Sequence, residues 1–362
     1  MIYLDNAAST PLLKYNVKEI LGNPSSPHAL GIAAEKNLNQ ARKQLSSILK
    51  CLSSEVVFTS GGTESNNLAI IGLAMANRRK SITFFAQPWE HPSVLEPLKF
   101  VKEQGLADIT LAPYEDWVSR TTTSTPIAII SHVNHETGDI NDITAIAATL
   151  KQKYPQAVMI VDGAQGFCKE PLNLFNIDIY TFSGHKFHAP TGTGGLMKRN
   201  NIRLTPLFYG GGQENKLRPG TENVNAIAQM ARTAETLTNN FANNHAHVSA
   251  IKSTLVEICH ILPYAHINSL HTISPYILNM SFTGLKGEVL VHALSKKGIY
   301  TSMGAACKSR KNSKTSLEAM GFSRERAESA IRFSFSHMNT IEEVVAAKAA
   351  IVECVQSLRQ II

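Results

Sequence analysis

Residues 177–186 have the sequence Ile-Asp-Ile-Tyr-Thr-Phe-Ser-Gly-His-Lys, a largely apolar run that ends in Ser183-Gly184-His185-Lys186. A second apolar run, Val158–Asp162, ends in an acid. Short runs that are apolar on both faces are typical of parallel strands covered by helices on both sides. The pattern therefore predicts two buried strands, one that ends at Asp162 and one that ends just before Lys186.

Similar runs alternate with longer amphipathic stretches through the first two hundred residues. This alternation predicts an α/β fold with a mostly parallel sheet between helices. Beyond it, residues 226–262 have a long helical pattern that connects to a smaller α+β domain. The predicted strands are Glu55–Thr59, Ser81–Phe85, Ile127–Ser131, Val158–Asp162, Ile177–Phe182, Gly194–Lys198, Asn279–Phe282 and Ile331–Phe335, and the predicted helices of the first part are Glu64–Asn77 and Ile140–Lys153.

Four of the predicted strands are followed at once by distinctive polar residues. In an open parallel sheet, ligands bind beyond the carboxyl ends of the strands. We therefore expect the four segments to form one site. They are Ser60–Thr63, His132–His135, Asp162–Gln165 and Ser183–Lys186.

The residues at these ends suit a phosphate-bearing aldehyde cofactor, pyridoxal phosphate. Lys186 suits a Schiff base to the aldehyde, and Asp162 would keep the pyridine nitrogen protonated, which makes the ring an electron sink. Gln165 is placed to reach the ring hydroxyl, and His91 to stack on the ring and exchange protons near neutral pH. For each residue alone, a solvated lysine, an Asp-Gly turn or a loop-capping histidine is the simpler explanation.

Ser60-Gly61-Gly62-Thr63 stands between a predicted strand and a predicted helix. Glycines let backbone amides approach an anion, and a helix N-terminus favours negative charge. The segment predicts a phosphate site, although a plain turn with Thr63 as N-cap explains it equally well. The GxxxxGK[ST] pattern of a P-loop is missing.

The histidines and cysteines do not predict a metal site. His132 with His135, and His185 with His188, are three positions apart but have no carboxylate or cysteine at a familiar spacing. The five cysteines form no CxxC pair, which argues against zinc and disulfides and indicates a reducing compartment. Cys307 alone has strongly cationic neighbours, in Lys308–Lys314, and these lower the pKa of a thiol.

Composition narrows the class of protein. With 362 residues and 43% hydrophobic residues, the chain can form a large domain and a smaller one. The apolar stretches are too short to cross a bilayer and no secretory signal is visible, so we expect a soluble cytoplasmic protein. The net charge of +7 is dispersed, and its one dense run lacks interleaved aromatic residues, so no direct nucleic-acid binding is expected.

With these residues in view, the sequence resembles the NifS/IscS-type cysteine desulfurases of the class V aminotransferase family, which are pyridoxal-phosphate-dependent and have a type I fold. The resemblance runs nearly end to end and includes many motifs in order. They are Tyr3–Pro11, Gly22–Ser26, Thr59–Asn67, Glu90-His91, Asp162–Gln165, Ser183–Lys186, Gly210–Glu214, Arg218–Thr221, Gly304–Cys307 and Arg332–Ser334.

The resemblance implies a role for each candidate residue. Lys186 would carry the cofactor and act as the base, and Asp162, Gln165 and His91 would contact its ring. The phosphate ligands would be Gly62, Thr63, Ser183 and His185, joined by Thr221 from the second subunit of a homodimer. Arg332 would clamp the substrate carboxylate through its bidentate fork, with His135 and Asn23 as further substrate contacts. Cys307 would be the nucleophile that takes the sulfur.

The implied reaction converts L-cysteine to L-alanine and leaves the sulfur as a persulfide on Cys307. The sulfur would pass to an acceptor protein, either an iron–sulfur scaffold or a tRNA thiolation enzyme. The implied domains are residues 1–14, which would pack with the small domain, a large cofactor-binding domain over 15–250, and a small domain over 251–362 with Cys307 and Arg332.

Two departures from the family pattern leave alternatives open. His135 stands where the family usually has asparagine, and the chain stops at Ile362 without the longer tail that many members use to dock a scaffold. One alternative is another class V enzyme, an aminotransferase or a selenocysteine lyase-like enzyme. The other is a catalytically weak sulfur-relay protein.

Overall fold

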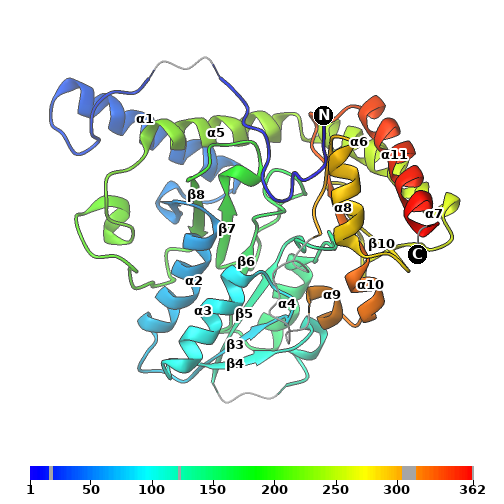
Figure 1. The fold of residues 1–362 in the computed structure, drawn as a ribbon. Helices are drawn as coiled ribbons and strands as arrows, with labels where there is room; N and C mark the ends of the chain where they lie inside the picture. Colours follow the sequence, from blue (N-terminus) through cyan, green and yellow to red (C-terminus); the bar gives the residue numbers. More distant parts are fainter. Residues whose placement is uncertain (16–18, 121–123, 304–314, 361–362) are drawn as a thin grey trace. The chain divides into compact units, whose positions relative to one another are not determined.

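The computed structural model describes residues 1–15, 19–120, 124–303 and 315–360 (Figure 1). The chain divides into two compact units. One comprises Pro11–His132 and Asn141–Asn239, and the other comprises Met1–Thr10, Val133–Ile140 and Asn240–Ile362. Residues 133–140, from the middle of the sequence, therefore group with the C-terminal residues. We call the units the sheet unit and the C-terminal unit.

The sheet unit is built on seven strands in the order β2-β8-β7-β6-β5-β3-β4. Of the seven strands, β8 alone runs antiparallel to the others. This confirms the predicted α/β fold with a mostly parallel sheet. The strands are β2 (Val56–Thr59), β3 (Ile82–Ala86), β4 (Asp108–Leu111), β5 (Thr125–Ser131), β6 (Val158–Asp162), β7 (Ile179–Ser183) and β8 (Gly194–Lys198).

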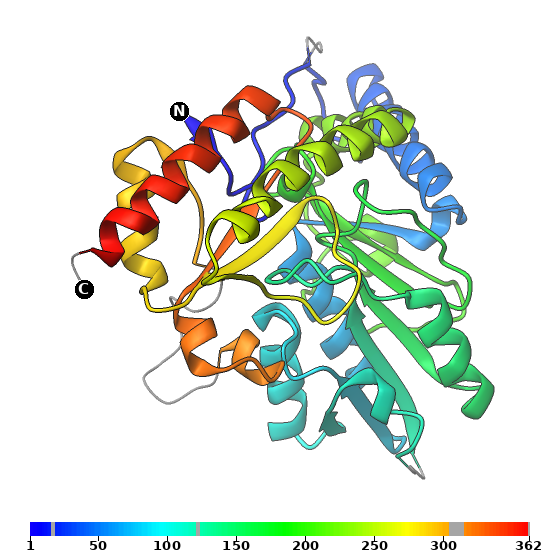
Figure 2. The same cartoon turned by 90° about the vertical axis from the view of Figure 1, so that its right-hand side faces the viewer.

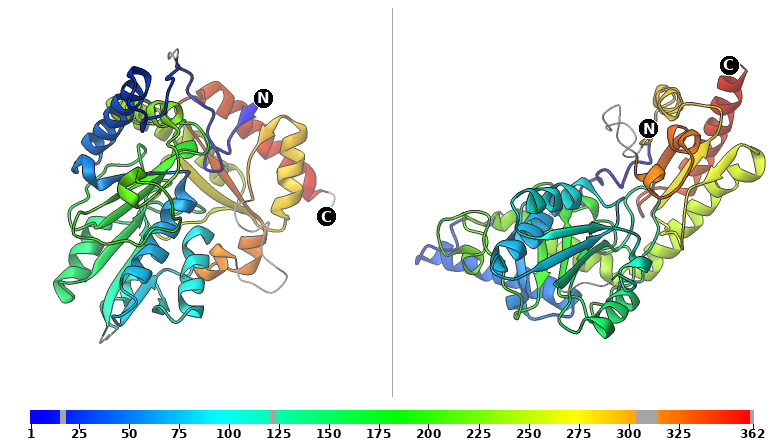
Figure 3. Two further views of the ribbon diagram at one scale, coloured as in Figure 1. Left: turned by 90° about the vertical axis from the view of Figure 1, so that its left-hand side faces the viewer. Right: turned by 90° about the horizontal axis from the view of Figure 1, so that it is seen from below.

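Helices cover both faces of this sheet because successive side chains of each strand point to opposite sides (Figure 3). On β6, Ile160 packs with α2 and α3, whereas Met159 and Val161 pack with α1, α4 and α5. The runs are therefore apolar throughout. The helices are α1 (Ala29–Ile48), α2 (Gly62–Ala76), α3 (Pro92–Glu103), α4 (Ile143–Lys153) and α5 (Val224–Asn239).

Two predicted helix starts were wrong by a few residues, for local reasons. Helix α2 begins at Gly62, with Gly61 as N-cap at φ 155°, so Thr63 lies inside the first turn and does not cap it. Helix α4 begins at Ile143, because Asp142 caps it by accepting from the Ala145 amide, 3.0 Å away. Ile140 instead pairs with Val133 in a β-bridge.

The C-terminal unit packs helices on one face of a three-stranded antiparallel sheet, β12-β10-β9 (Figure 2). The N-terminal strand β1 (Ile2–Tyr3) belongs to this unit and pairs in parallel with β11 (Ile299–Tyr300). The sheet strands are β9 (Ala265–Ile267), β10 (Ile277–Phe282) and β12 (Ala330–Ser334). The helices are α6 (Phe241–Val256), α7 (Ile258–Ile261), α8 (Gly287–Lys296), α9 (Ser316–Ala319), α10 (Arg324–Glu328) and α11 (Ile341–Arg359).

None of the helices in the described ranges has the length and apolar character needed to cross a bilayer.

Candidate active site

The strand register of the sheet unit brings together the ends of the strands that precede the predicted site segments. Asp162 on β6 pairs with Ser131 on β5 and with Thr181 on β7. Ser183, two residues further along β7, pairs with Gly194 on β8, which in turn pairs with Thr59 on β2. The carboxyl ends of β2, β5, β6 and β7 therefore lie at one edge of the sheet, as predicted.

Asp162 is buried, with 5% of its surface exposed, and its carboxylate has two hydrogen-bond donors. Asn66 Nδ2 lies 2.8 Å from Oδ2, and the Ala164 amide lies 2.9 Å from Oδ1. Burying a carboxylate costs free energy unless hydrogen bonds stabilise its charge, and these donors do so. The arrangement suits a carboxylate that accepts a bond from a protonated ring nitrogen.

The turn at Gly61-Gly62 forms a narrow cradle beside the end of β7. A Cβ atom added to Gly62 would lie 3.2 Å from Ser183 Cβ, and one added to Gly194 would lie 2.6 Å from Gly61 Cα. The amides in the first turn of α2 have no partner within the helix, and the Ser183 hydroxyl stands next to them. These donors fit the phosphate of pyridoxal phosphate.

His185 and Lys186 form a short 3-10 turn with Gly184 directly after β7. Burial, with the charges of Lys186 and Lys169, lowers the pKa of His185 to about 4. At neutral pH the imidazole is therefore uncharged and contributes hydrogen bonding. Lys169, 5% exposed, donates through Nζ to Gln165 Oε1 at 3.1 Å, a contact that the sequence pattern did not indicate.

His91 caps the N-terminus of α3 with its ring. Its Nδ1 accepts from the Ser93 amide at 3.1 Å and lies 2.8 Å from Ser93 Oγ. The ring itself is exposed, which suits a residue that stacks on a ligand.

The histidines weighed as metal ligands have structural partners. His132 Nδ1 lies 3.1 Å from the Tyr180 hydroxyl, and burial lowers the pKa of His132 to about 4. His188 Nδ1 lies 2.7 Å from the Pro11 carbonyl oxygen. Among the described residues, no group of three or more His, Cys, Asp or Glu side chains is placed to hold a metal ion.

Thr221 and Asn23 lie on exposed loops of the sheet unit. The Thr221 loop is anchored by Glu214, a buried carboxylate that accepts two bonds from Arg42 and one from the Phe58 amide. A second ion pair, between Arg218 Nε and Glu64 Oε1 at 2.9 Å, ties the loop to the first turn of α2. Asn23 Oδ1 accepts from the Ser25 amide within its own turn.

In the C-terminal unit, Arg332 is 6% exposed and already bound by two acceptors. Its Nη1 donates to the His135 carbonyl oxygen at 2.8 Å, and its Nη2 lies 3.2 Å from Asp5 Oδ1. Its Nε is buried without a hydrogen-bond partner in the described part of the chain. A buried donor in this state is costly, and an anionic ligand would satisfy it.

His135, which stands where the family usually has asparagine, belongs to the same group of residues around Arg332. His135 Nε2 lies 3.5 Å from Oε1 of Glu136, which is 3% exposed. Ser302 pairs with Arg332 through two backbone hydrogen bonds of 2.7 and 3.2 Å. The segment that leads to Cys307 therefore starts beside Arg332. Cys307 itself lies outside the described residues.

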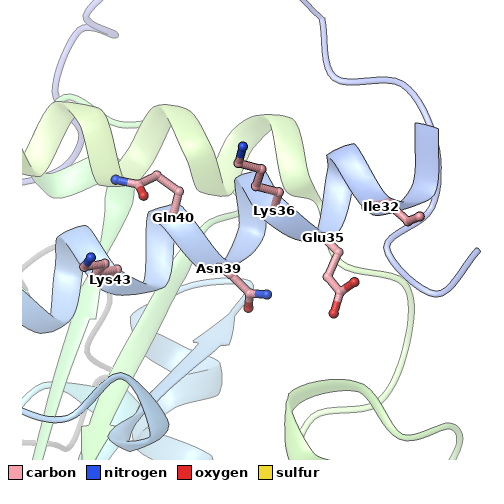
Figure 4. A pocket seen from close by; sticks show the side chains of 6 residues that line it. All are labelled: Ile32, Glu35, Lys36, Asn39, Gln40 and Lys43. Carbon is pink, nitrogen blue, oxygen red and sulfur yellow. The ribbon is translucent and has the colours of Figure 1, made fainter. Parts of the chain in front are cut away.

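A shallow hollow on the surface of α1 has no candidate catalytic group (Figure 4). One helix provides its whole lining, and none of the predicted site residues is part of it. The lining consists of Ile32, Glu35, Lys36, Asn39, Gln40 and Lys43.

Comparison with known proteins identifies the family to which the chain belongs. The family model described as aminotransferase class-V matches residues 2–346, so the chain belongs to that family, whose cofactor is pyridoxal phosphate. A NifS/IcsS protein homolog of Lactobacillus delbrueckii subsp. bulgaricus is 37% identical over 382 residues, which cover 100% of this chain and 99% of the relative. The cysteine desulfurase IscS of Methanosarcina thermophila is 33% identical, covering 99% of this chain and 93% of its own.

A solved structure described as a NifS-like protein superimposes with a TM-score of 0.90 at 31% identity, covering 99% of both chains. Within the class-V aminotransferases, the chain is a member of the NifS/IscS family of cysteine desulfurases. The resemblance noted from the sequence is confirmed, and so are the fold and the cofactor expected from it.

Glu90, next to His91 in the sequence, is a buried acid to which sequence analysis gave no role. It is 1% exposed, and its Oε1 accepts from the Ser131 amide at 3.1 Å. Burial raises the pKa of Glu90 from 4.5 to about 8; the Ser131 amide opposes this shift and the charge of Asp162 adds to it. Glu90 is therefore mostly protonated at neutral pH.

We expect Glu90 to make stability depend on pH. Between about pH 4.5 and 8 the folded protein keeps a proton that the unfolded chain has released. The free energy of unfolding should thus fall as pH rises, by at most about 1.4 kcal/mol per pH unit for one proton. Urea unfolding of wild type and Glu90→Gln at pH 5.5, 6.5 and 7.5 should show that the variant loses this slope. Glu96→Gln, on the exposed side of α3, should keep it; equal slopes in all three proteins would contradict the assignment.

Proposed function

We propose that this protein transfers the sulfur of L-cysteine to its own Cys307 and releases L-alanine. The observation that carries the proposal is the buried Asp162 carboxylate at the end of β6, oriented by two donors, with Lys186 following the neighbouring strand β7. This is the pair of groups that a pyridoxal-phosphate enzyme requires. The family membership of the chain supports the same conclusion.

Different residues of the sheet unit hold different parts of the cofactor. Lys186 attaches it and serves as the base for the α-proton of the substrate. Asp162, Gln165 and His91 hold its ring, and the ring, when bound, delocalises negative charge from the α-carbon of the substrate. The phosphate ligands are Gly62, Thr63, Ser183 and His185.

Arg332 binds the substrate carboxylate, and the chemistry of its fork supports this role. Asp5 and the His135 carbonyl fix the two Nη atoms, and the buried Nε remains as a donor to be satisfied. A second carboxylate near the fork gains a charge-assisted bond with little loss of side-chain entropy. His135 and Asn23 complete the proposed contacts with the substrate.

Cys307 accepts the sulfur. Its thiolate takes the sulfur atom of L-cysteine to form a protein persulfide; the electron pair of the broken carbon–sulfur bond stays with the carbon, which takes up a proton to give L-alanine. The following residues, Lys308–Lys314, include four cations that favour the thiolate. An aminotransferase would not need this nucleophile.

The active form is a homodimer in which Thr221 reaches the cofactor phosphate of the second subunit. Large apolar side chains exposed on the sheet unit support an interface, because their burial is favourable. They are Leu21, Leu30, Ile32, Phe208 and Tyr209. The persulfide sulfur passes to an acceptor protein in the cytoplasm, an iron–sulfur scaffold or a tRNA thiolation enzyme. Free thiols at Cys51, Cys168, Cys259 and Cys354 suit such a reducing compartment.

Mass spectrometry of the cysteine-treated protein tests the sulfur transfer. We expect one added sulfur atom on the peptide that contains Cys307, and Cys307→Ala should lose both this adduct and nearly all release of alanine. Cys259→Ala, which removes another free thiol, is the matched control and should keep both. Full alanine release by Cys307→Ala would contradict the persulfide mechanism and favour another class V activity.

Kinetics of Arg332→Lys test the carboxylate clamp. Lysine keeps the positive charge but loses the fork, so KM for L-cysteine should rise about tenfold with a smaller change in kcat. Arg326→Lys is the control, because Arg326 is an arginine of the same unit whose Nε is also buried without a partner in the described ranges. Equal effects of the two substitutions on KM would contradict the role of Arg332.

A further inference from the structure

Asn66, on α2, is connected to two of the three residues proposed to hold the cofactor ring, directly to Asp162 and through Ser93 to His91. Its side chain is 1% exposed, and its Nδ2 lies 2.8 Å from Asp162 Oδ2 and 2.9 Å from Ser93 Oγ. An ionised carboxylate only accepts hydrogen bonds, so the amide nitrogen must face Asp162. The amide oxygen then accepts from Thr181 Oγ1 at 2.7 Å. Both ends of the amide are therefore engaged.

The bonds of Asn66 fix the position of the Asp162 carboxylate. Thr181 is fully buried on β7 and pairs with Asp162 across the strands, so the Asn66 amide bonds to side chains of both β6 and β7. Of the two donors to Asp162, the Ala164 amide belongs to the turn after β6 and Asn66 comes from α2. Removal of Asn66 would leave one carboxylate oxygen buried without this donor, which costs free energy.

The second N–H of Asn66 acts on His91 through Ser93. Ser93 Oγ accepts this N–H, so its own hydroxyl proton is available to His91 Nδ1, 2.8 Å away. The Ser93 backbone amide donates to the same nitrogen at 3.1 Å. A neutral imidazole that accepts at Nδ1 carries its proton on Nε2. The Ser93 amide already makes Nδ1 an acceptor, and Asn66, through the Ser93 hydroxyl, adds a second donor that strengthens this tautomer of His91.

We propose that Asn66 is a positioning residue that couples two of the three proposed ring contacts of the cofactor, Asp162 and His91. One N–H positions the Asp162 carboxylate that faces the ring nitrogen of the cofactor. The other orients the Ser93 hydroxyl, which in turn helps to fix the orientation and tautomer of the His91 imidazole. This inference rests on the proposed function, because Asp162 and His91 are ring contacts only if the cofactor binds there.

Comparison of two ligands tests the Asp162 branch. We would measure by equilibrium dialysis the Kd of pyridoxal phosphate and of its 1-deaza analogue, in which C–H replaces the ring nitrogen. In Asn66→Ala, binding of pyridoxal phosphate should weaken about tenfold, as expected for loss of a bond to a charged group. Binding of the analogue should change less than about twofold, because it makes no bond through the ring nitrogen.

Asn77→Ala is the matched control, since Asn77 follows the last residue of α2 and its side chain donates to the Leu73 carbonyl oxygen of the same helix. It should leave both dissociation constants unchanged. Equal losses for both ligands in Asn66→Ala would show a merely structural role and overturn the inference alone. Wild-type protein that binds neither ligand would contradict the proposed function, and the inference with it.

Nitrogen NMR of ¹⁵N-histidine-labelled full-length protein, before cofactor is added, tests the His91 branch separately, and its wild-type and Ser93 arms do not need Asn66→Ala. His91→Gln identifies the signals. We expect wild-type His91 to be protonated on Nε2, its Nδ1 resonance to move in Ser93→Ala and in Asn66→Ala, and Ser93→Thr, which keeps the hydroxyl, to resemble wild type. A proton on Nδ1 in the wild type, or an Nδ1 resonance that moves in neither variant, would overturn the coupling.

Discussion

The burial of the Asp162 carboxylate is the constraint on which the sheet unit depends. A charge that is 95% removed from solvent is tolerable only where donors surround it, and here the donors come from the turn after β6 and from α2. This requirement fixes the position of α2 against strands β6 and β7. The same helix carries the Gly61-Gly62 turn at its start, so one placement of α2 positions both the proposed phosphate cradle and the proposed partner of the ring nitrogen.

In the C-terminal unit, a buried positive charge is likewise stabilised by surrounding hydrogen-bond partners. Arg332 lies on a buried strand, and the N-terminal Asp5 and the His135 carbonyl satisfy two of its nitrogens. The N-terminal segment is part of this arrangement, because the parallel bridge of Asp5 with Ser334 sets the carboxylate beside the guanidinium. The groups that stabilise the buried charge of Arg332 therefore also hold in place the guanidinium that we propose to bind the substrate.

Much of this could be predicted from sequence, for reasons that also explain what could not. The predicted bounds of the strands Val158–Asp162 and Gly194–Lys198 match the structure, because a strand that is buried on both faces forms an uninterrupted apolar run in the sequence. The edge strand β4 was missed because its residues are partly exposed and lack that signal. Asn66 and Glu90 were missed as site residues because their roles depend on contacts with residues 96 and 41 positions away, which no local pattern encodes.

The most direct test of the account is the attachment point of pyridoxal phosphate. The protein, loaded with cofactor, would be reduced with borohydride, digested and analysed by mass spectrometry. We predict one pyridoxyl group per chain, on Lys186, and Lys186→Ala should carry none at any other lysine. Attachment to a different lysine, or no stable attachment in the wild type, would contradict the assignment of the active site to the ends of β6 and β7.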